Sequence, residues 1–286
     1  MSRSKMTEWT YDYFNMSFPI NAVVHVEINR PAKLNAWIEP MWLELAKIFN
    51  RISHDPEIRA VLLTGAGERA FSAGLDIQAA SQGGILSESA QDNARKANAL
   101  RRHILEFQSC ISALEKCEKP IISLLHGSSY GLAIDLTLAT DIRLCTSRSP
   151  PTTFCVKEVD IGIAADIGTL SRLPKAVGNL SWVKDIALTA RPFGWEEALR
   201  VGLVSAAYPS KKEGIEAGLK LASAIAEKSP VAVMGTKKLI NYSRDHSVED
   251  GLEFTAVWNS AMVQTSDVKN AMTAGMQKRK PIFEKL

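Results

Sequence analysis

Residues 121–135 of this 286-residue chain read IISLLHGSSYGLAID, and this stretch decides the fold class. Its first five residues are apolar apart from one serine, which predicts a buried β-strand. The glycines at positions 127 and 131 then predict a turn, and a helix is expected from about Leu132 to Ala139. A buried strand that passes through a glycine turn into a helix is typical of alternating α/β proteins.

The segments before this stretch repeat the same alternation. Residues 22–28 are rich in β-branched side chains and predict a strand, and residues 60–65 predict a second, buried strand. Between them, apolar side chains recur on one helical face at Trp42, Leu45, Phe49 and Ile52. A loop over residues 71–89 and a long helix that ends near Cys117 are expected to follow.

The segments after residue 135 change in character. Residues 142–145 and 154–157 predict two more strands, and the chain after Asp166 is predicted to be almost wholly helical. We therefore expect two parts: an α/β core with the active site at residues 1–208, and a helical oligomerisation region at residues 209–286. Amphipathic helices of this kind pack either on a neighbouring subunit or back on their own chain.

Composition excludes several classes of function. The formal net charge is only +3, and no basic run with interleaved aromatic residues indicates nucleic-acid binding. No apolar run approaches the ~18 residues that a membrane-spanning helix needs. The four cysteines form no C-x-x-C pair and have no histidine cluster beside them, so we expect reduced, buried thiols and no metal site.

Three segments have residues that are suited to chemistry: residues 71–76, 126–135 and 156–166. The first is a loop with a glycine that lets a ligand approach the backbone. In the second, backbone N–H groups at a helix start lack intrahelical partners and point outward. Two such N–H groups from two loops would form an oxyanion hole. Each segment taken alone is better explained as a simple connection.

Carboxylates provide the second indication. Glu158 and Asp166 lie in a mostly apolar stretch, and apolar surroundings raise carboxyl pKa values toward neutrality, which suits acid–base catalysis. Asp135 lies in the first turn of a predicted helix, where it favours the helix dipole whatever its other role. The alternative for any of the three is an ordinary surface carboxylate that faces water.

Taken together, these segments resemble the crotonase (enoyl-CoA hydratase/isomerase) superfamily, and within it the group of delta(3,5)-delta(2,4)-dienoyl-CoA isomerases. The similarity runs from Ala22 onward. It includes residues 118–120, 141–143, 156–166, 172–175, 229–233 and 242–248. The resemblance implies a crotonase-like α/β spiral of repeated β-β-α units with a C-terminal helical trimerisation region. It also implies a homo-hexamer built as a dimer of trimers.

The resemblance also assigns roles to residues. The backbone N–H groups of Ala73 and Leu132 would form the oxyanion hole for a thioester carbonyl. Glu158 matches the carboxylate that exchanges the C2 proton, Asp166 the one that acts at C6, and Asp135 a third acid that tunes this pair. The remaining substrate-binding positions that it implies are Gly74, Leu75, Asp76, Ile77, Gly131 and Ala133.

The implied activity converts a 3,5-dienoyl-CoA to a 2,4-dienoyl-CoA during oxidation of unsaturated fatty acids. It needs an acyl-CoA substrate and no separate cofactor, since coenzyme A is part of the substrate. One departure from the family pattern is Gly131-Leu132-Ala133, where the family usually has a run of glycines, and the Leu132 side chain must point away from the thioester. A second is a three-residue insertion around residues 149–151.

Other activities on the same fold remain open. An enoyl-CoA hydratase would use two glutamates, whereas this chain has the shorter Asp135 at the first position and adds Asp166. A delta(3)-delta(2)-enoyl-CoA isomerase would need Glu158 alone. A non-catalytic acyl-CoA-binding homologue is supported only by the altered glycine run. The final Glu284-Lys285-Leu286 weakly resembles the peroxisomal S-K-L signal, so a peroxisome is expected, with the mitochondrial matrix as the alternative.

Overall fold

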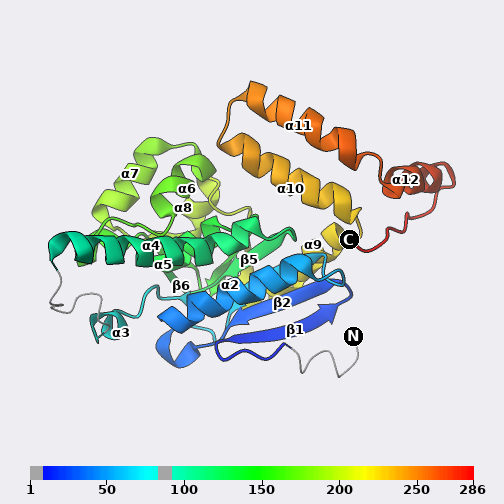
Figure 1. Ribbon diagram of the computed structural model, residues 1–286. Coiled ribbons are helices and arrows are strands. Elements are labelled where there is room, and N and C mark those ends of the chain that lie inside the picture. Colours follow the sequence, from blue (N-terminus) through cyan, green and yellow to red (C-terminus); the bar gives the residue numbers. More distant parts are fainter. Residues whose placement is uncertain (1–8, 83–91) are drawn as a thin grey trace.

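The computed structural model describes residues 9–82 and 92–286, and within them two β-sheets are covered by helices (Figure 1). The larger sheet has six strands in the order β1-β2-β3-β5-β7-β10. They are β1 (Phe14–Ile20), β2 (Val23–Ile28), β3 (Ala60–Gly65), β5 (Ile121–Leu125), β7 (Ile142–Ser149) and β10 (Ala206–Ser210). The smaller sheet has the order β4-β6-β8-β9, with β4 (Ala70–Ser72), β6 (Ser128–Tyr130), β8 (Thr153–Cys155) and β9 (Phe193–Gly194).

Helices follow and enclose these strands. The helices of the core are α2 (Glu39–His54), α3 (Ile77–Gln82), α4 (Asn93–Lys116), α5 (Leu132–Leu138), α6 (Thr169–Val177), α7 (Leu180–Thr189), α8 (Trp195–Arg200) and α9 (Lys211–Ala226). Three more helices follow, α10 (Pro230–Arg244), α11 (Val248–Met262) and α12 (Ser266–Met276). Two short 3-10 helices, η1 (Pro31–Lys33) and η2 (Glu158–Ile161), complete the assignment.

The two sheets are built from a repeated unit. Three consecutive strand pairs, β3–β4, β5–β6 and β7–β8, each place their first strand in the larger sheet and their second in the smaller one. Within each sheet, these strands pair in parallel with those of the next unit. Helices follow the second strand of each pair. This arrangement confirms the predicted α/β spiral of β-β-α units.

Alternate residues of the larger sheet enter two separate cores. On β3, Val61 and Leu63 belong to the main core with α2, whereas Ala60 and Leu62 face a second core with α9. Both strand faces are therefore apolar, which explains why β3 and β5 are continuous hydrophobic runs. Helix α9 approaches closely because Gly218 lacks a Cβ, which would lie 2.7 Å from a methyl carbon of Leu62.

The structure differs from the sequence-based expectations in three places. Strand β1, which pairs antiparallel with β2, was not expected. The predicted loop over residues 71–89 includes the end of β4 and helix α3, and its residues 83–89 lie outside the described part of the chain. Strands β9 and β10 interrupt the region after Asp166 that was predicted to be almost wholly helical, because each pairs with an existing sheet edge.

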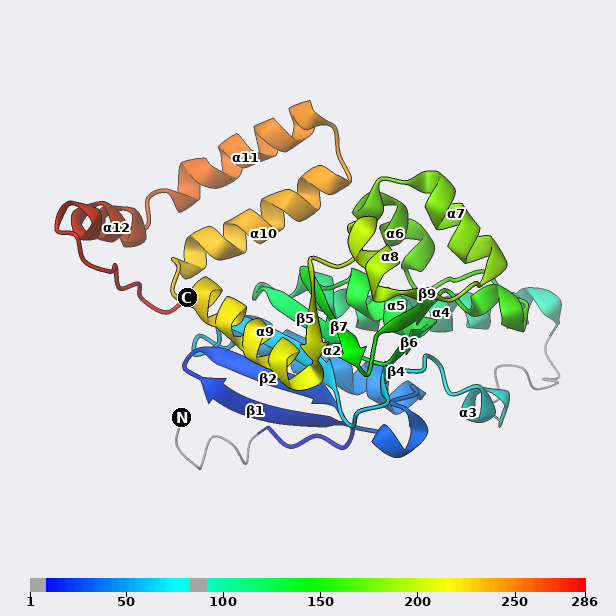
Figure 2. The same cartoon turned by 180° about the vertical axis from the view of Figure 1, so that it is seen from behind.

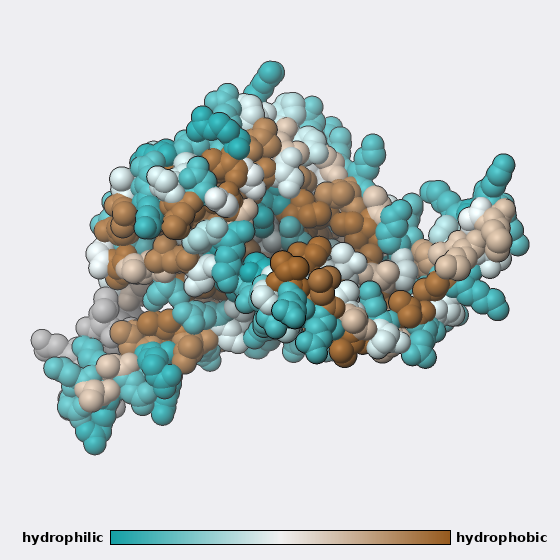
Figure 3. Space-filling view, turned by 90° about the horizontal axis from the view of Figure 1, so that it is seen from above, coloured by the Kyte–Doolittle hydropathy of each residue, from teal (hydrophilic) through white to brown (hydrophobic). Residues whose placement is uncertain are grey.

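The C-terminal helices α10, α11 and α12 form an arm that extends away from the two sheets (Figures 1 and 2). Many apolar side chains of the arm are exposed, among them Ile240, Val248, Leu252, Val257, Met272 and Met276. Apolar patches interrupt the hydrophilic surface in the space-filling view (Figure 3). By contrast, α9, which also follows residue 209, packs on the sheet. The division at residue 209 stays a prediction, and so does the oligomerisation role of the arm.

In the described part of the chain, no helix has the length and apolar character required to cross a bilayer. The four cysteines are buried and free, in agreement with the expectation of packed, reduced thiols. Burial raises the pKa of the Cys145 thiol to about 12, so this group stays protonated and unreactive near neutral pH.

Candidate active site

The three segments that were singled out in the sequence meet at one edge of the smaller sheet. Residues 73–77 follow β4, residues 131–135 follow β6, and residues 156–158 follow β8. These three strands are neighbours and run parallel. Their carboxyl ends therefore lie side by side, which is where binding sites of parallel sheets are commonly found.

Asp135 is the innermost of the three candidate acids. It lies in α5, is only 2% exposed, and accepts two hydrogen bonds on Oδ1 from Thr169, one from the backbone N–H at 2.6 Å and one from Oγ1 at 2.8 Å. Burial raises the pKa of Asp135 to about 7 and the charge of Glu158 adds to the rise, although the Thr169 hydrogen bonds oppose it. This carboxyl is fixed in place and titrates near neutral pH.

Glu158 begins η2, immediately after the segment that leaves β8. Its Oε2 atom is buried and has no hydrogen-bond partner among the described residues. Its Oε1 lies over the backbone of Gly131, where a Cβ would come within 3.3 Å of it. Burial raises the pKa of Glu158, and the charge of Asp166 adds to this rise. A buried carboxylate oxygen without a partner is costly in free energy and is available to accept a proton.

Asp166 forms the outer side of the site, and its side chain reaches solvent. Its backbone carbonyl accepts a hydrogen bond of 2.5 Å from Nε2 of Gln108 on α4. Partial burial raises the pKa of Asp166, whereas the charge of His103 acts in the opposite direction. Asp166 therefore combines a fixed backbone with a carboxyl that can exchange protons with water.

The structure thus brings all three predicted acids together. The charge of Glu158 acts on Asp135, and the charge of Asp166 acts on both other carboxyls. Neighbouring like charges disfavour simultaneous ionisation, so we expect the titrations of the three acids to be coupled. Such a cluster can hold one acid protonated while its neighbour is ionised.

Two backbone N–H groups of the neighbouring loops have no hydrogen-bond acceptor among the described residues. Leu132 is the first residue of α5, so its N–H has no partner within the helix. The loop after β4 approaches it closely, because a Cβ on Gly74 would lie 3.5 Å from the Leu132 nitrogen and 2.8 Å from the Tyr130 carbonyl oxygen. Gly74 also has a φ of +91°, which other residues adopt only with strain. The loops can meet only because this residue is glycine.

The expected role of the Ala73 N–H as an oxyanion donor is wrong. That N–H donates a 2.9 Å hydrogen bond to the carbonyl of Leu34 and is not available to a ligand. In the same loop, Leu75 has an N–H for which no described residue is an acceptor. Its neighbours are held on the opposite side by Trp37, which donates to the Gly74 carbonyl and accepts from the Asp76 N–H.

The other predicted substrate-binding residues have varied surroundings. Asp76 is paired with Arg30 at 2.8 Å and accepts from the Ala79 N–H at the start of α3, and the hydrogen bond from Arg30 lowers its pKa. Ile77 is largely exposed. The Gly131 N–H donates to the Cys155 carbonyl, which joins α5 to β8. Asp76 and Gly131 therefore hold the loops in position.

The side chains of Leu132 and Ala133 are buried in the main core. The Leu132 side chain is only 4% exposed and packs with core residues, which agrees with the requirement that it leave the substrate position free. Replacement of the usual glycines therefore fills core volume and leaves the backbone donor in place.

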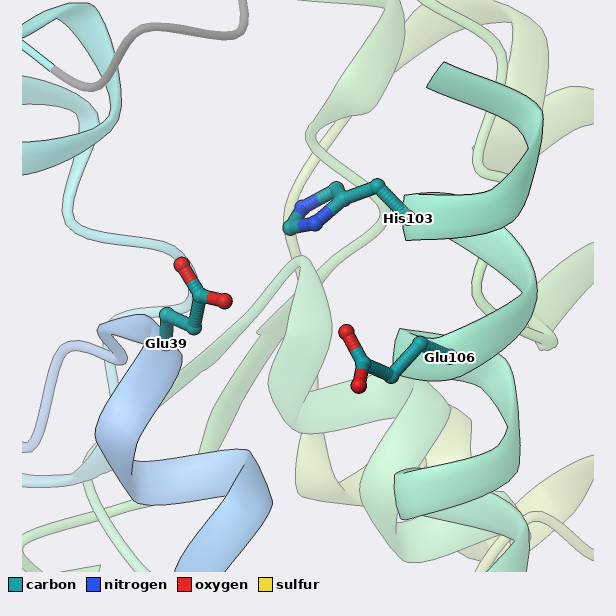
Figure 4. Close-up of side chains that lie close together, drawn as sticks. All are labelled: Glu39, His103 and Glu106. Carbon is teal, nitrogen blue, oxygen red and sulfur yellow. The ribbon is translucent and has the colours of Figure 1, made fainter. Parts of the chain in front are cut away.

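A separate cluster has donor types suitable for a divalent cation. Glu39 of α2 and His103 and Glu106 of α4 direct their side chains toward one another (Figure 4), and one ligand atom of each lies within 4.8 Å of the others. Zinc is bound by such imidazole and carboxylate groups. No local sequence pattern predicts this cluster, because it forms only when α2 and α4 pack together.

Sequence reasoning also missed Thr169, the hydrogen-bond partner of Asp135, and Gln108, which holds the Asp166 backbone. Thr169 lies 34 positions from Asp135, and Gln108 lies 58 positions from Asp166. No local pattern in the sequence predicts contacts at these separations.

Comparison with known proteins gives a consistent result. Residues 20–285 match the family described as enoyl-CoA hydratase/isomerase. A Rattus norvegicus protein named "Delta(3,5)-Delta(2,4)-dienoyl-CoA isomerase, mitochondrial" is 42% identical over 275 residues, which cover 96% of this chain and 83% of the rat protein. An Arabidopsis thaliana protein of the same name, but peroxisomal, is 42% identical over 266 residues, with 93% of this chain and 94% of that protein covered.

Solved structures share the fold as well. The crystal structure of an enoyl-CoA hydratase from Bacillus anthracis superposes with a TM-score of 0.84 at 24% sequence identity, and it covers 96% of this chain and 99% of its own. At that identity, the similarity shows the fold alone.

Proposed function

The chain belongs to the enoyl-CoA hydratase/isomerase family, and from this membership we infer that it isomerises 3,5-dienoyl-CoA to 2,4-dienoyl-CoA. The observation that carries this inference is the cluster of three mutually interacting acids beside two unengaged backbone N–H groups. Relatives with this activity in their names match over nearly the whole chain.

The N–H groups of Leu75 and Leu132 are proposed to bind the thioester carbonyl of the substrate. Removal of a C2 proton places negative charge on this oxygen, and two preorganised donors stabilise that charge. Loss of one such donor typically lowers the rate by about 10²–10³-fold. The support for this pairing is that Leu132 begins a helix and that Gly74 brings the second loop against it.

The proposed reaction transfers one proton away from C2 and delivers another to C6. Ionised Glu158 removes the C2 proton, and the electron pair forms the C2–C3 double bond. The C3–C4 double bond shifts to C4–C5, and the electrons of C5–C6 accept the proton of Asp166 at C6. Glu158 ends protonated and Asp166 ionised, and the exposure of Asp166 allows exchange with water to restore the starting state. No electrons are gained or lost, so we propose no cofactor.

Asp135 is proposed to adjust the acidity of this pair without exchanging protons with the substrate. Its Oδ1 is engaged by Thr169, and its side chain is almost fully buried. Neither feature suits activation of a water molecule, so the isomerase is favoured over a hydratase that uses two carboxylates. A delta(3)-delta(2)-enoyl-CoA isomerase would need Glu158 alone, so it would not explain a second acid, Asp166, whose pKa is also raised.

A non-catalytic acyl-CoA-binding protein is the remaining alternative. The buried, unpartnered Oε2 of Glu158 argues against it, because such an atom typically costs about 1–3 kcal/mol of stability. A binding protein gains nothing from this cost. The catalytic proposal explains it as a base that is kept available.

The test is to add purified protein to a 3,5-dienoyl-CoA and to follow ultraviolet absorbance. A shift of one double bond into C2–C3 would give the absorbance of a 2-enoyl thioester, whereas a shift of both gives the more extended 2,4-dienoyl thioester, which absorbs at a longer wavelength. A trans-2-enoyl-CoA serves as the hydratase control, because hydration would remove its absorbance. Absence of any change with the diene, together with rapid loss of the monoene signal, would favour the hydratase.

We further propose that the protein assembles as a homo-hexamer of two trimers and acts in peroxisomes, with the mitochondrial matrix as the alternative. The exposed apolar side chains of the arm support assembly, since such surfaces are commonly covered by a partner. Light scattering on the purified protein should give the mass of a trimer or a hexamer. A monomer at micromolar concentration would contradict the assembly, and fluorescence microscopy of the tagged chain would decide the compartment.

A further inference from the structure

The loop of residues 166–169 joins two parts of the acid site. Asp166 lies at its start, and Thr169, which holds Asp135, lies at its end. Between them, Gly168 has a φ of +151°, and a Cβ at this position would collide with Nη1 of Arg172. The guanidinium group of Arg172 therefore lies directly against the loop backbone.

Arg172 holds this loop against helix α4. Its Nη2 donates to Oγ of Ser112 at 2.9 Å and to Oε2 of Glu115 at 3.1 Å, and its Nε donates to the same carboxylate oxygen at 3.4 Å. The Arg172 and Glu115 side chains are only 12% and 19% exposed. Shielding from water strengthens such a charge-assisted pair compared with a surface ion pair.

Glu115 extends the contact to the C-terminal arm. It pairs with Arg244 at the end of α10, and Arg244 pairs in turn with Asp245 at 2.7 Å. Asp245 pairs with Lys175, which lies in the same helix α6 as Arg172. Burial opposes ionisation of Glu115, yet Arg244 and Arg172 together hold its pKa below the usual value. The five side chains form a row of four ion pairs that links α6, α4 and the end of α10.

We propose that Arg172 is a positioning residue that aligns Asp166 for proton transfer to the substrate, and that Glu115 and Arg244 link this alignment to the seating of the C-terminal arm. The inference rests on the proposed isomerase function. Proton transfer is sensitive to small displacements, and a shift of about 1 Å can lower a rate about 10²-fold. Since Glu158 lies on a different loop, removal of Arg172 should affect the two proton transfers unequally.

The experiment measures two rates in the full-length protein. Isomerisation of a 3,5-dienoyl-CoA reports both proton transfers, and exchange of the C2 hydrogen in deuterated water reports the Glu158 step alone. We expect Arg172→Met to lower isomerisation at least tenfold and C2 exchange less than threefold, with little change in KM. Arg172→Lys keeps the charge without the forked geometry and should give an intermediate loss.

Arg244→Met tests the link to the arm and should lower isomerisation about threefold, with C2 exchange unchanged. The matched control is Arg191→Met, because Arg191 also pairs with two carboxylates, Asp185 and Glu197, and among the described residues none of its ion pairs reaches this loop or α10. It should leave the ratio of the two rates as in the wild type. If Arg172→Met fails to fold, Glu115→Gln and Ser112→Ala remove its partners one at a time and should change the ratio in the same direction.

If both rates fall in parallel in the Arg172 variants, so that the ratio of isomerisation to C2 exchange is unchanged, the positioning role is overturned. An unchanged ratio in Arg244→Met would overturn the link to the arm. Neither result is confused with failure of the proposed function, which would show as a wild-type protein without isomerisation.

Discussion

The two sides of the acid site differ in how their carboxyl groups are bound. The inner side, Asp135 and Thr169, is almost fully buried and internally hydrogen-bonded. The outer side, Glu158 and Asp166, has a buried oxygen without a partner and a carboxyl that reaches solvent. A buried carboxyl that is held by hydrogen bonds sets the local electrostatics, whereas a carboxyl with an unpartnered or solvent-exposed oxygen can move protons. The difference therefore separates tuning from proton transfer.

The largest effect is expected at Glu158, because glutamine has nearly the same shape as glutamate but cannot accept the C2 proton. Glu158→Gln removes the base at C2 and should lower isomerisation by about 10²–10⁴-fold, the range typical of a general base. Exchange of the C2 hydrogen with deuterated water should fall to the same extent. The control is Asp160→Asn, which changes an exposed neighbour paired with Lys157. A loss of only a few-fold in Glu158→Gln would exclude it as the base.

Asp166→Asn should produce a smaller loss of isomerisation, about 10²-fold, because water can replace an exposed acid in part. Exchange at C2 should continue, since Glu158 remains in place. A mass shift in recovered 3,5-dienoyl-CoA after incubation in deuterated water would measure this exchange. Equal losses of C2 exchange and isomerisation would mean that Asp166, like Asp135, tunes the site and does not itself transfer the C6 proton.

Asp135 is expected to affect stability more than substrate chemistry. Its pKa is about 7 in the folded chain, compared with about 3.9 when unfolded. Between these pH values the unfolded chain releases a proton that the folded chain keeps, so the free energy of unfolding falls as the pH rises from about 4 to about 7. Asp135→Asn should remove this contribution, which amounts to at most about 4 kcal/mol.

Urea denaturation of both proteins at pH 5 and pH 8 measures this difference. Distant titrating groups are common to the two proteins, so the change in pH dependence reports Asp135 together with its coupling to Glu158 and Asp166. Asparagine keeps a carbonyl oxygen that can accept from Thr169, so the fold should be preserved. Identical pH dependence in the two proteins would mean that Asp135 is not held protonated in the fold.

Local sequence patterns were sufficient for the elements that bury one continuous face. Strand β3 has the predicted bounds because all six of its residues are buried, and the helical stripe from Trp42 to Ile52 lies in α2. Strand β1 was missed because most of its side chains are only partly buried. Helix α9 was assigned to the oligomerisation region because amphipathicity does not reveal which surface a helix covers.

The candidate acids could be found from sequence because the family motif fixes their positions, and the structure brings all three together. The engagement of the Ala73 N–H could not be predicted. The choice between Ala73 and Leu75 depends on a hydrogen bond to Leu34, which lies in a distant turn. Likewise, the row of ion pairs through Glu115 and Arg244 forms only when three helices meet, so no sequence spacing predicts it.

The parallel strands β4, β6 and β8 allow the loops of the site to change one at a time. Each supplies one loop to the site, and the strands themselves hold these loops at fixed separation. One loop contributes Leu75, the next Leu132 and Asp135, and the third Glu158. A substitution in one loop can therefore alter a single chemical part while the others keep their positions. On such a scaffold, new reactions can arise by successive small steps, each starting from a folded and partly active ancestor.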